Sequence, residues 1–274
     1  MEPDLCLPLQ QHPQYSAALR QTGCAVLEVH LPGAAPVQAI SRFGLTLASR
    51  GPIWRAEYGP NNANILRGSS LHVINSDGHD LAALRSAGYR QIHTPNWVAE
   101  LSLSGTSSAR LAAMKPKWRA TLRRAEKARL RVKHDRFDPL RHGWLLSADL
   151  AQQRSKGFHS LPHAVLQAYA KASPDNALVF VASDKREPIA AMLFLVHGHV
   201  ATYYLGWSGE AGRRSGAHHA LLVRACDHLA RRGLARLDLG HVDTVNAPGL
   251  ARFKIGTGAQ VRALGGSWLR VPCL

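Results

Sequence analysis

Residues 202–268 contain the side chains whose types and spacing could do chemistry. The elements predicted there are a strand over 201–206, a polar loop over 207–216, a helix over 217–232, a strand over 234–239 and a turn at 253–254. Arg213, Ser215 and Gly216 stand at the end of the loop, directly before the helix. The N-terminus of a helix offers free backbone N–H groups and the positive end of its dipole, which suit a phosphate or an oxyanion. We therefore predict an anion-binding loop at these three residues, and acyl transfer as the chemistry it serves.

An amine that attacks an acyl group needs a group to accept its proton. Asp243 and His241 follow the strand that is predicted to end at Leu239, and they are the candidates for that base. A structural role for Asp243, capping the next turn, is an equally good interpretation. Tyr204 lies near the end of the predicted central strand and could hydrogen-bond a substrate, although an aromatic residue in a strand more often belongs to the core.

The segment over 114–133 is strongly basic, with nine Lys or Arg residues and a single acid, Glu126. Three apolar side chains within it recur at helical spacing: Trp118, Leu122 and Ala125. This pattern predicts an amphipathic helix over 117–128. Like charges spaced four residues apart destabilise a helix by roughly 0.2–0.5 kcal/mol per pair, and a bound anion would offset that repulsion. We predict phosphate contacts from Arg119, Arg123, Arg124 and Lys127; a solvated cationic face is the alternative.

The charge of the whole chain agrees with a polyanionic partner. Its 274 residues include 34 Lys and Arg against 18 Asp and Glu, a net charge of +16. Such an excess favours tRNA, DNA, an anionic membrane face or phosphorylated substrates. Compositional drift in a GC-rich genome is the other explanation, because Arg far outnumbers Lys.

Several classes of protein do not fit the sequence. No apolar run approaches the roughly 20 residues of a membrane span, and the N-terminus lacks the pattern of a signal peptide, so we expect a cytoplasmic protein. The four cysteines are scattered without disulfide or metal spacing, and the 15 histidines show no persuasive ligand spacing. We therefore expect no metal site.

Strands and helices alternate along the chain, which predicts an α/β (α+β) fold. The first part contains predicted strands over 71–75, 89–93 and 97–103 and a helix over 79–87. The second part contains predicted helices over 142–154 and 162–172, and then strands over 177–183, 189–196 and 200–205 in an antiparallel meander. We divide the chain into an N-terminal domain over 1–105, a basic helical connector over 106–135 and a catalytic domain over 136–274.

Four separated stretches share their order and spacing with a known family: an Arg-Gly-Pro strand at 49–53, the basic helix at 114–127, the start of a long strand at 188–191, and a C-terminal signature at 238–240 and 249–256. In these stretches the chain resembles the FemABX-like branch of the GNAT acyltransferase superfamily, in which two GNAT-like domains stand in tandem. The likeness covers about residues 24–268. The resemblance implies tandem GNAT-like domains, each with a mixed central sheet flanked by helices, the first of them truncated here.

The resemblance also implies a catalytic role for Lys254 of the Phe-Lys-x-Gly motif. Aminolysis of an ester or thioester passes through a tetrahedral oxyanion, and a fixed ammonium beside it stabilises the developing charge. A surface lysine on a turn is the alternative. Phe253 is expected to pack, and it could also shape an acyl or adenine pocket.

The acyl donor is predicted from one residue at which this chain departs from the superfamily's pattern. His218 stands where a CoA-binding loop has a second small residue, which weakens close backbone approach to a pyrophosphate. We therefore expect an aminoacyltransferase that binds tRNA, moves an aminoacyl group from aminoacyl-tRNA to an amine of a small or peptide-like acceptor, and holds no tightly bound cofactor. The first alternative is an acetyl-CoA-dependent N-acetyltransferase. A non-catalytic RNA-binding protein is the further alternative.

Overall fold

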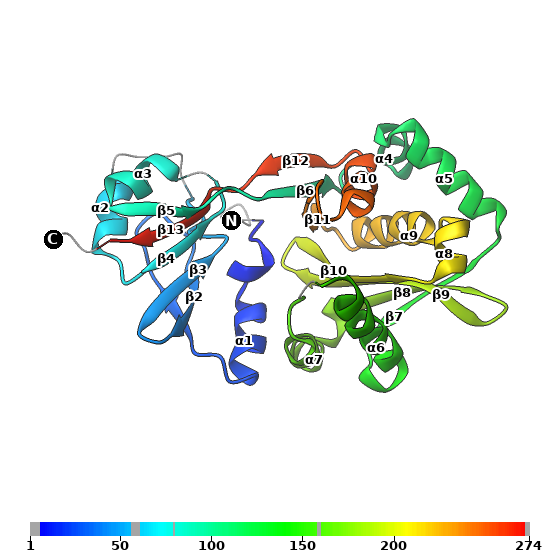
Figure 1. Ribbon diagram of the computed structural model, residues 1–274, viewed down its shortest axis with the longest axis horizontal. Coiled ribbons are helices and arrows are strands. Elements are labelled where there is room, and N and C mark those ends of the chain that lie inside the picture. Colours follow the sequence, from blue (N-terminus) through cyan, green and yellow to red (C-terminus); the bar gives the residue numbers. More distant parts are fainter. Residues whose placement is uncertain (1–5, 56–60, 79, 158–159, 272–274) are drawn as a thin grey trace. The chain divides into compact units, whose positions relative to one another are not determined.

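The computed structural model describes residues 6–55, 61–78, 80–157 and 160–271. Its contacts divide the chain into two compact units, one of residues 1–98 with 262–274 and one of residues 99–261. Each unit has a mixed β-sheet with helices packed against it (Figure 1). The predicted α/β fold with mixed central sheets is confirmed. Among the residues described, no helix combines the length and the apolar character that crossing a membrane requires.

The first unit is built on a six-stranded sheet. Its strands, in spatial order, are β1 (Val26–Val29), β2 (Val37–Arg42), β3 (Leu45–Ser49), β4 (Val73–Ser76), β13 (Gly266–Arg270) and β5 (Tyr89–His93). The β3–β4 pair is parallel and the other neighbours are antiparallel. Strand β13 therefore lies between two strands that precede it by more than 170 residues in the sequence, and its Trp268 is completely buried.

Short helices accompany this sheet: η1 (Leu9–Gln11), α1 (Pro13–Gln21), α2 (Asn61–Gly68) and α3 (Leu81–Ser86). The predicted strands over 71–75 and 89–93 correspond to β4 and β5, and the predicted helix over 79–87 corresponds to α3. Residue 79 lies outside the described residues. Helix α2 supplies the crossover that a parallel β3–β4 pair requires.

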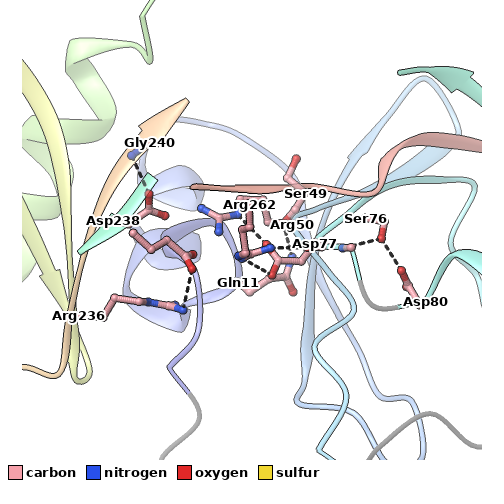
Figure 2. A network of polar contacts seen from close by, with 12 residues as sticks. Gln11, Ser49, Arg50, Ser76, Asp77, Asp80, Arg236, Asp238, Gly240 and Arg262 are labelled. Atoms are coloured by element: carbon pink, nitrogen blue, oxygen red, sulfur yellow. Dashed lines mark hydrogen bonds and ion pairs between the residues drawn. The ribbon is translucent and has the colours of Figure 1, made fainter. Parts of the chain in front are cut away.

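The Arg-Gly-Pro stretch does not continue a strand, as the sequence predicted, but follows the end of β3. Arg50 has a positive φ of 54° there, and its Nε donates to Asp77 Oδ1 at 2.8 Å. Arg262 donates to the other oxygen of the same carboxylate and to the Asp77 carbonyl, both at 2.7 Å (Figure 2). A Cβ atom at Gly51 would lie 2.7 Å from Cδ of Gln11, so only glycine leaves room for that side chain.

The second unit is built on a seven-stranded sheet. Its strands, in spatial order, are β12 (Gln260–Ala263), β6 (Trp97–Ser102), β11 (Arg236–His241), β10 (Val200–Ser208), β9 (Glu187–His197), β8 (Ala177–Asp184) and β7 (Arg131–Arg136). The run β8–β9–β10 is antiparallel, so the predicted meander is confirmed. The pair β10–β11 is parallel and is connected through helix α9 (Ala217–Arg231).

Helices cover both faces of this second sheet (Figure 1). On one face, α9 and α5 (Pro116–Lys127) pack against alternate strand side chains such as Phe180, Met192 and Phe194. The other face is covered by α6 (Pro139–Lys156) and α7 (His163–Ala172). The Tyr169 hydroxyl of α7 donates to the Val196 carbonyl of β9 at 2.6 Å. The amphipathic prediction for α5 is confirmed, because Trp118, Leu122 and Ala125 are its buried residues.

The structure differs from two local predictions in the second unit. The expected polar loop over 207–216 is the end of β10 followed by a short helix, α8 (Glu210–Ser215). The expected turn at Phe253-Lys254 is part of helix α10 (Pro248–Gly256), which begins with Pro at its first position. In α8, a Cβ at Gly212 would overlap the Ile189 carbonyl of β9, so this glycine lets the helix pack closely on the strand.

The arrangement of the units also differs from the predicted division at residues 105 and 135. Helix α5, expected as a connector together with α4 (Ser107–Ala113), contributes Trp118, Leu122 and Ala125 to the core of the second unit. Strand β13, expected in the C-terminal domain, pairs with β4 and β5 of the first unit. The pairing of β13 with β4 and β5 leaves no local pattern in the sequence.

Candidate active site

A cavity of about 600 Å³ lies in the second unit, where strands β10 and β11 separate. The parallel ladder between them covers residues 200–202 and 236–238, although β10 continues to Ser208 and β11 to His241. The pairing of β10 with β9 shifts register at Tyr204, which marks a bulge at the start of this gap. Residues of α6 from one face of the sheet and of α8, α9 and α10 from the other line the cavity.

Lys254 of α10 points into this cavity and is only 5% exposed. Its Nζ donates to the His241 carbonyl at 2.6 Å. Burial lowers the pKa of Lys254 from 10.5 to about 8, while the Asp238 carboxylate acts in the opposite direction. A cation fixed at the edge of a cavity and protonated near neutral pH suits the stabilisation of a developing oxyanion.

The last residues of β11 are shaped around this lysine. Gly240 has a φ of 74°, which favours glycine, and a Cβ there would lie 3.9 Å from Lys254 Nζ. The Gly240 N–H donates to Asp238 Oδ1 at 2.7 Å (Figure 2). The carboxylate of buried Asp238 therefore fixes the backbone at the end of β11. The next carbonyl along the strand, that of His241, accepts the hydrogen bond from Lys254 Nζ.

Two histidines at the start of α9 also line the cavity, and both are neutral near pH 7. His218 Nε2 donates to the Trp207 carbonyl at 2.8 Å, and burial lowers its pKa. The His219 ring lies 4.4 Å from that of Trp118 and 5.1 Å from that of Phe253. Burial, followed by the neighbouring His218 and Arg124, lowers the pKa of His219 to about 4.

The structure brings together only part of the predicted anion loop. Arg213 and Gly216 line the cavity, and Arg213 Nη1 donates to the Ser208 carbonyl at 2.6 Å. Gly216 has a φ of 76°, and a Cβ there would lie 2.8 Å from Thr121 Cγ2 of α5. Ser215 does not line the cavity, because its hydroxyl donates to the Ala211 carbonyl of its own helix at 2.8 Å.

Tyr204, predicted to hydrogen-bond a substrate, and Asp243, a candidate base, are placed differently from each other. Tyr204 lines the cavity, as does its neighbour Tyr203, whose pKa is raised by burial first and by Asp149 second. Asp243 does not line it. The Asp243 carboxylate instead accepts hydrogen bonds from the Asn246 side-chain amide at 2.8 Å and from the backbone N–H groups of Asn246 and Val245 at 2.8 and 2.9 Å. These hydrogen bonds, the one from the Asn246 side chain first, lower its pKa. This is the turn-capping geometry that the sequence offered as the alternative.

The basic helix borders a second cavity, of about 430 Å³. Three basic side chains are among the residues that line it: Lys115, Lys117 and Arg252. It shares His219, Gly249 and Phe253 with the first cavity, so the two adjoin. Of the residues predicted to contact phosphates, Arg123, Arg124 and Lys127 are exposed on α5, and Arg119 Nη1 donates to the Ala112 carbonyl at 3.1 Å. None of these four lines either cavity.

The sequence predictions missed Asp149 of α6, which lines the first cavity. The signal was present, because Asp149 continues the buried face of α6 formed by His142, Leu145 and Leu146. A carboxylate at a buried position of an amphipathic helix costs folding free energy unless it is hydrogen-bonded, ion-paired or bound to a ligand. Lys156 and Ser160 line the same wall, and no periodicity marks them.

Comparisons with known proteins agree with this geometry. A family model described as "Acetyltransferase (GNAT) domain" matches residues 113–254, more than half of the 274 residues. The structure of FemX is similar over 96% of this chain and 94% of that chain, at 13% identity and a TM-score of 0.72. The L-PGS from Bacillus licheniformis is similar over 99% and 93% of the two chains, at 14% identity and a TM-score of 0.57. A search of curated protein sequences gave no match.

The family model spans α5, the meander, α9 and β11 and ends at Lys254, so it covers the elements that form the cavity. The likeness to FemX extends over both units and confirms the predicted tandem fold. The chain belongs to the GNAT acetyltransferase-domain family, and its fold is that of the FemABX-like branch.

Proposed function

We propose that this protein transfers an aminoacyl group from aminoacyl-tRNA to an amine of a small or peptide-like acceptor. The observation that carries the proposal is the buried Lys254 in a cavity that adjoins a second cavity lined in part by basic side chains. The first cavity offers room for the reacting groups, and the second offers room for the nucleotide end of a donor.

Lys254 would act on the acyl carbonyl. The acceptor nitrogen attacks the carbonyl carbon of the ester, and negative charge develops on the carbonyl oxygen. The ammonium of Lys254, held by the His241 carbonyl, stabilises that oxygen at low exposure to water, where the interaction is strong. The nitrogen attacks as a neutral amine and gives up a proton as the C–N bond forms. The ester C–O bond then breaks, and the ribose oxygen takes up that proton and leaves as a hydroxyl.

The second cavity has the chemistry that a single-stranded nucleotide end needs. The half-buried ring of Phe253 lines it, and so do the side chains of Lys115, Lys117 and Arg252. Bases stack on aromatic rings, and phosphates pair with Lys and Arg, in sites of this kind. The exposed cations of α5 extend the positive surface beyond the cavity. The FemABX-like branch also includes aminoacyl-tRNA-dependent transferases.

An acetyl-CoA-dependent N-acetyltransferase is the second candidate. It is favoured by the match to an acetyltransferase domain and by Arg213 and Gly216, which line the first cavity at the start of α9. Against it, His218 occupies the position next to this turn, and its ring bonds to the Trp207 carbonyl. That ring takes space a pyrophosphate would need for close backbone approach.

Two labelled donors separate these functions. The protein is incubated with a pool of ³H-aminoacyl-tRNAs or with ¹⁴C-acetyl-CoA, and L-alaninamide serves as a simple amine acceptor. The proposal predicts ³H-labelled amide from the tRNA pool, lost in Lys254→Met, and no labelled product from acetyl-CoA. Acetyl transfer instead would establish the second candidate. Salt-sensitive tRNA binding without transfer from either donor would identify a non-catalytic RNA-binding protein.

A pair of charge-reversing substitutions tests whether the basic helix α5 binds tRNA. Arg123→Glu with Lys127→Glu should weaken tRNA binding and flatten its salt dependence, because each lost phosphate contact removes about 0.7–0.9 from the slope of log K against log salt. The matched control is Arg154→Glu with Lys171→Glu, which changes the charge by the same amount at exposed positions of α6 and α7, on the other face of the sheet. Equal losses in both double variants would show that only net charge matters.

A further inference from the structure

Asp149 is a buried carboxylate in the wall of the first cavity, on the side formed by α6. Its side chain is 5% exposed, and it lies on the same helix face as Leu145 and Leu146. Among the described residues that line this cavity, Asp149 is the one that carries a carboxylate. The charged side chains with it are cations: Lys156, Arg213 and Lys254.

The hydrogen bonds to this carboxylate are one-sided. Gln153 Nε2 donates to Oδ2 at 2.5 Å, His163 Nε2 at 2.9 Å and the Ser160 hydroxyl at 3.2 Å. Among the residues that the structure describes, these three bonds to Asp149 all end on Oδ2. Three donors fix the orientation of the carboxylate, and the orientation leaves Oδ1 as the oxygen for a ligand in the cavity.

The negative charge of Asp149 acts on another group that lines the cavity. Tyr203, which lines it, has its pKa raised by burial first and then by Asp149. A buried carboxylate that keeps its charge requires compensation, and hydrogen bonds supply only part of it. A cationic ligand would supply the rest.

We propose that Asp149 binds the ammonium group of the acceptor through Oδ1, and so selects acceptors that carry a primary amine. His163 is a positioning residue, which holds the carboxylate from α7. Arg213 of α8 and Lys254 of α10 repel an ammonium, which favours its binding at the carboxylate of α6 and leaves the acyl carbonyl to Lys254. This assignment rests on the proposed use of an amine acceptor and names the residue that recognises it.

Two probes of nearly the same shape test the charge preference: L-alaninamide, which carries an ammonium, and L-lactamide, which carries a hydroxyl in its place. Their binding is followed by NMR through the imidazole signals of histidine-labelled protein, and the His163 signal is assigned by its absence in His163→Gln. Alaninamide should bind the wild-type protein at least about tenfold more tightly than lactamide, because a charge-assisted hydrogen bond exceeds a neutral one by that order.

Asp149→Asn keeps the shape of the side chain and removes its charge, so it should abolish the preference and leave lactamide binding unchanged. His163→Gln keeps the carboxylate and should retain a reduced preference. Equal binding of the two probes to the wild-type protein, no binding of alaninamide, or a preference that survives in Asp149→Asn would each overturn the proposal. The wild-type comparison decides the question even if a variant fails to fold.

The readout requires no acyl donor, so its failure differs from failure of the proposed function. Alaninamide binding at Asp149 without transfer from either donor would refute only the transfer. Transfer to amines without a charge preference at Asp149 would refute only the assignment made for this carboxylate.

Discussion

Replacing Lys254 with methionine should make the protein more stable while removing its transfer activity. The side chain is 5% exposed, and burial lowers its pKa from 10.5 to about 8. At about pH 7 the lysine is protonated in both the folded and the unfolded chain, so folding pays for moving the charge out of water. Each pH unit of pKa difference corresponds to about 1.4 kcal/mol, which gives a penalty of about 3 kcal/mol.

The substitution also has a cost. Methionine leaves the His241 carbonyl without the donor that lies 2.6 Å away, which costs about 1 kcal/mol. The net gain is therefore about 2 kcal/mol. For a unit of this size, 1 kcal/mol shifts the melting temperature by about 2–4 °C, so the variant should melt roughly 4–8 °C above the wild type.

The stability difference between Lys254→Met and the wild type should depend on pH in one direction. The pKa is lower in the folded chain, so the unfolded chain binds more protons between pH 8 and 10.5. The penalty is fully present below about 8 and disappears as the pH rises towards 10.5, and the advantage of methionine should shrink with it. Thermal unfolding at about pH 7 and pH 9.5 measures this, with Lys171→Met at an exposed position as the control. A variant that is less stable at pH 7, or a difference independent of pH, would refute the reasoning.

Three further predictions concern activity and packing. The transfer rate at saturating substrates should fall as the pH rises through about 8, because the oxyanion role requires protonated Lys254; a pH–rate profile checks this. Gly256→Ala should lower the free energy of unfolding by about 1–3 kcal/mol in urea titrations, because the added Cβ would lie 2.5 Å from Trp118 Cδ1. Arg262→Ala should cost about 2 kcal/mol by the same measurement, since it removes two hydrogen bonds to buried Asp77, and a loss below about 0.5 kcal/mol would contradict this.

The parts of the fold that follow from local pattern were predictable from the sequence. The helical spacing of Trp118, Leu122 and Ala125 placed α5 within one residue of its observed bounds. Short turns between apolar runs placed β8, β9 and β10 as an antiparallel meander. In both cases the signal lies within a window of a few turns, where periodicity is informative.

Features set by distant contacts were not predictable. Gly212 reads as a loop residue, yet it belongs to α8 because that helix packs against the Ile189 carbonyl, where a side chain would not fit. The burial of Lys254 could not be inferred from its neighbours in sequence, because the walls around it come from β10, β11 and α6. For Asp243, the sequence left a base and a turn cap equally open, and only the positions of Val245 and Asn246 show which contacts it makes.

The position of β13 has a consequence for the order of folding during synthesis. The second unit is one continuous segment, residues 99–261, whereas the sheet of the first unit needs residues 266–270 between β4 and β5. On the ribosome, the first 98 residues emerge with two strand edges, those of β4 and β5, whose shared partner does not yet exist. Exposed edges of this kind invite pairing with other chains. We expect the nascent first unit to depend on chaperone protection until the last strand of its sheet has been made.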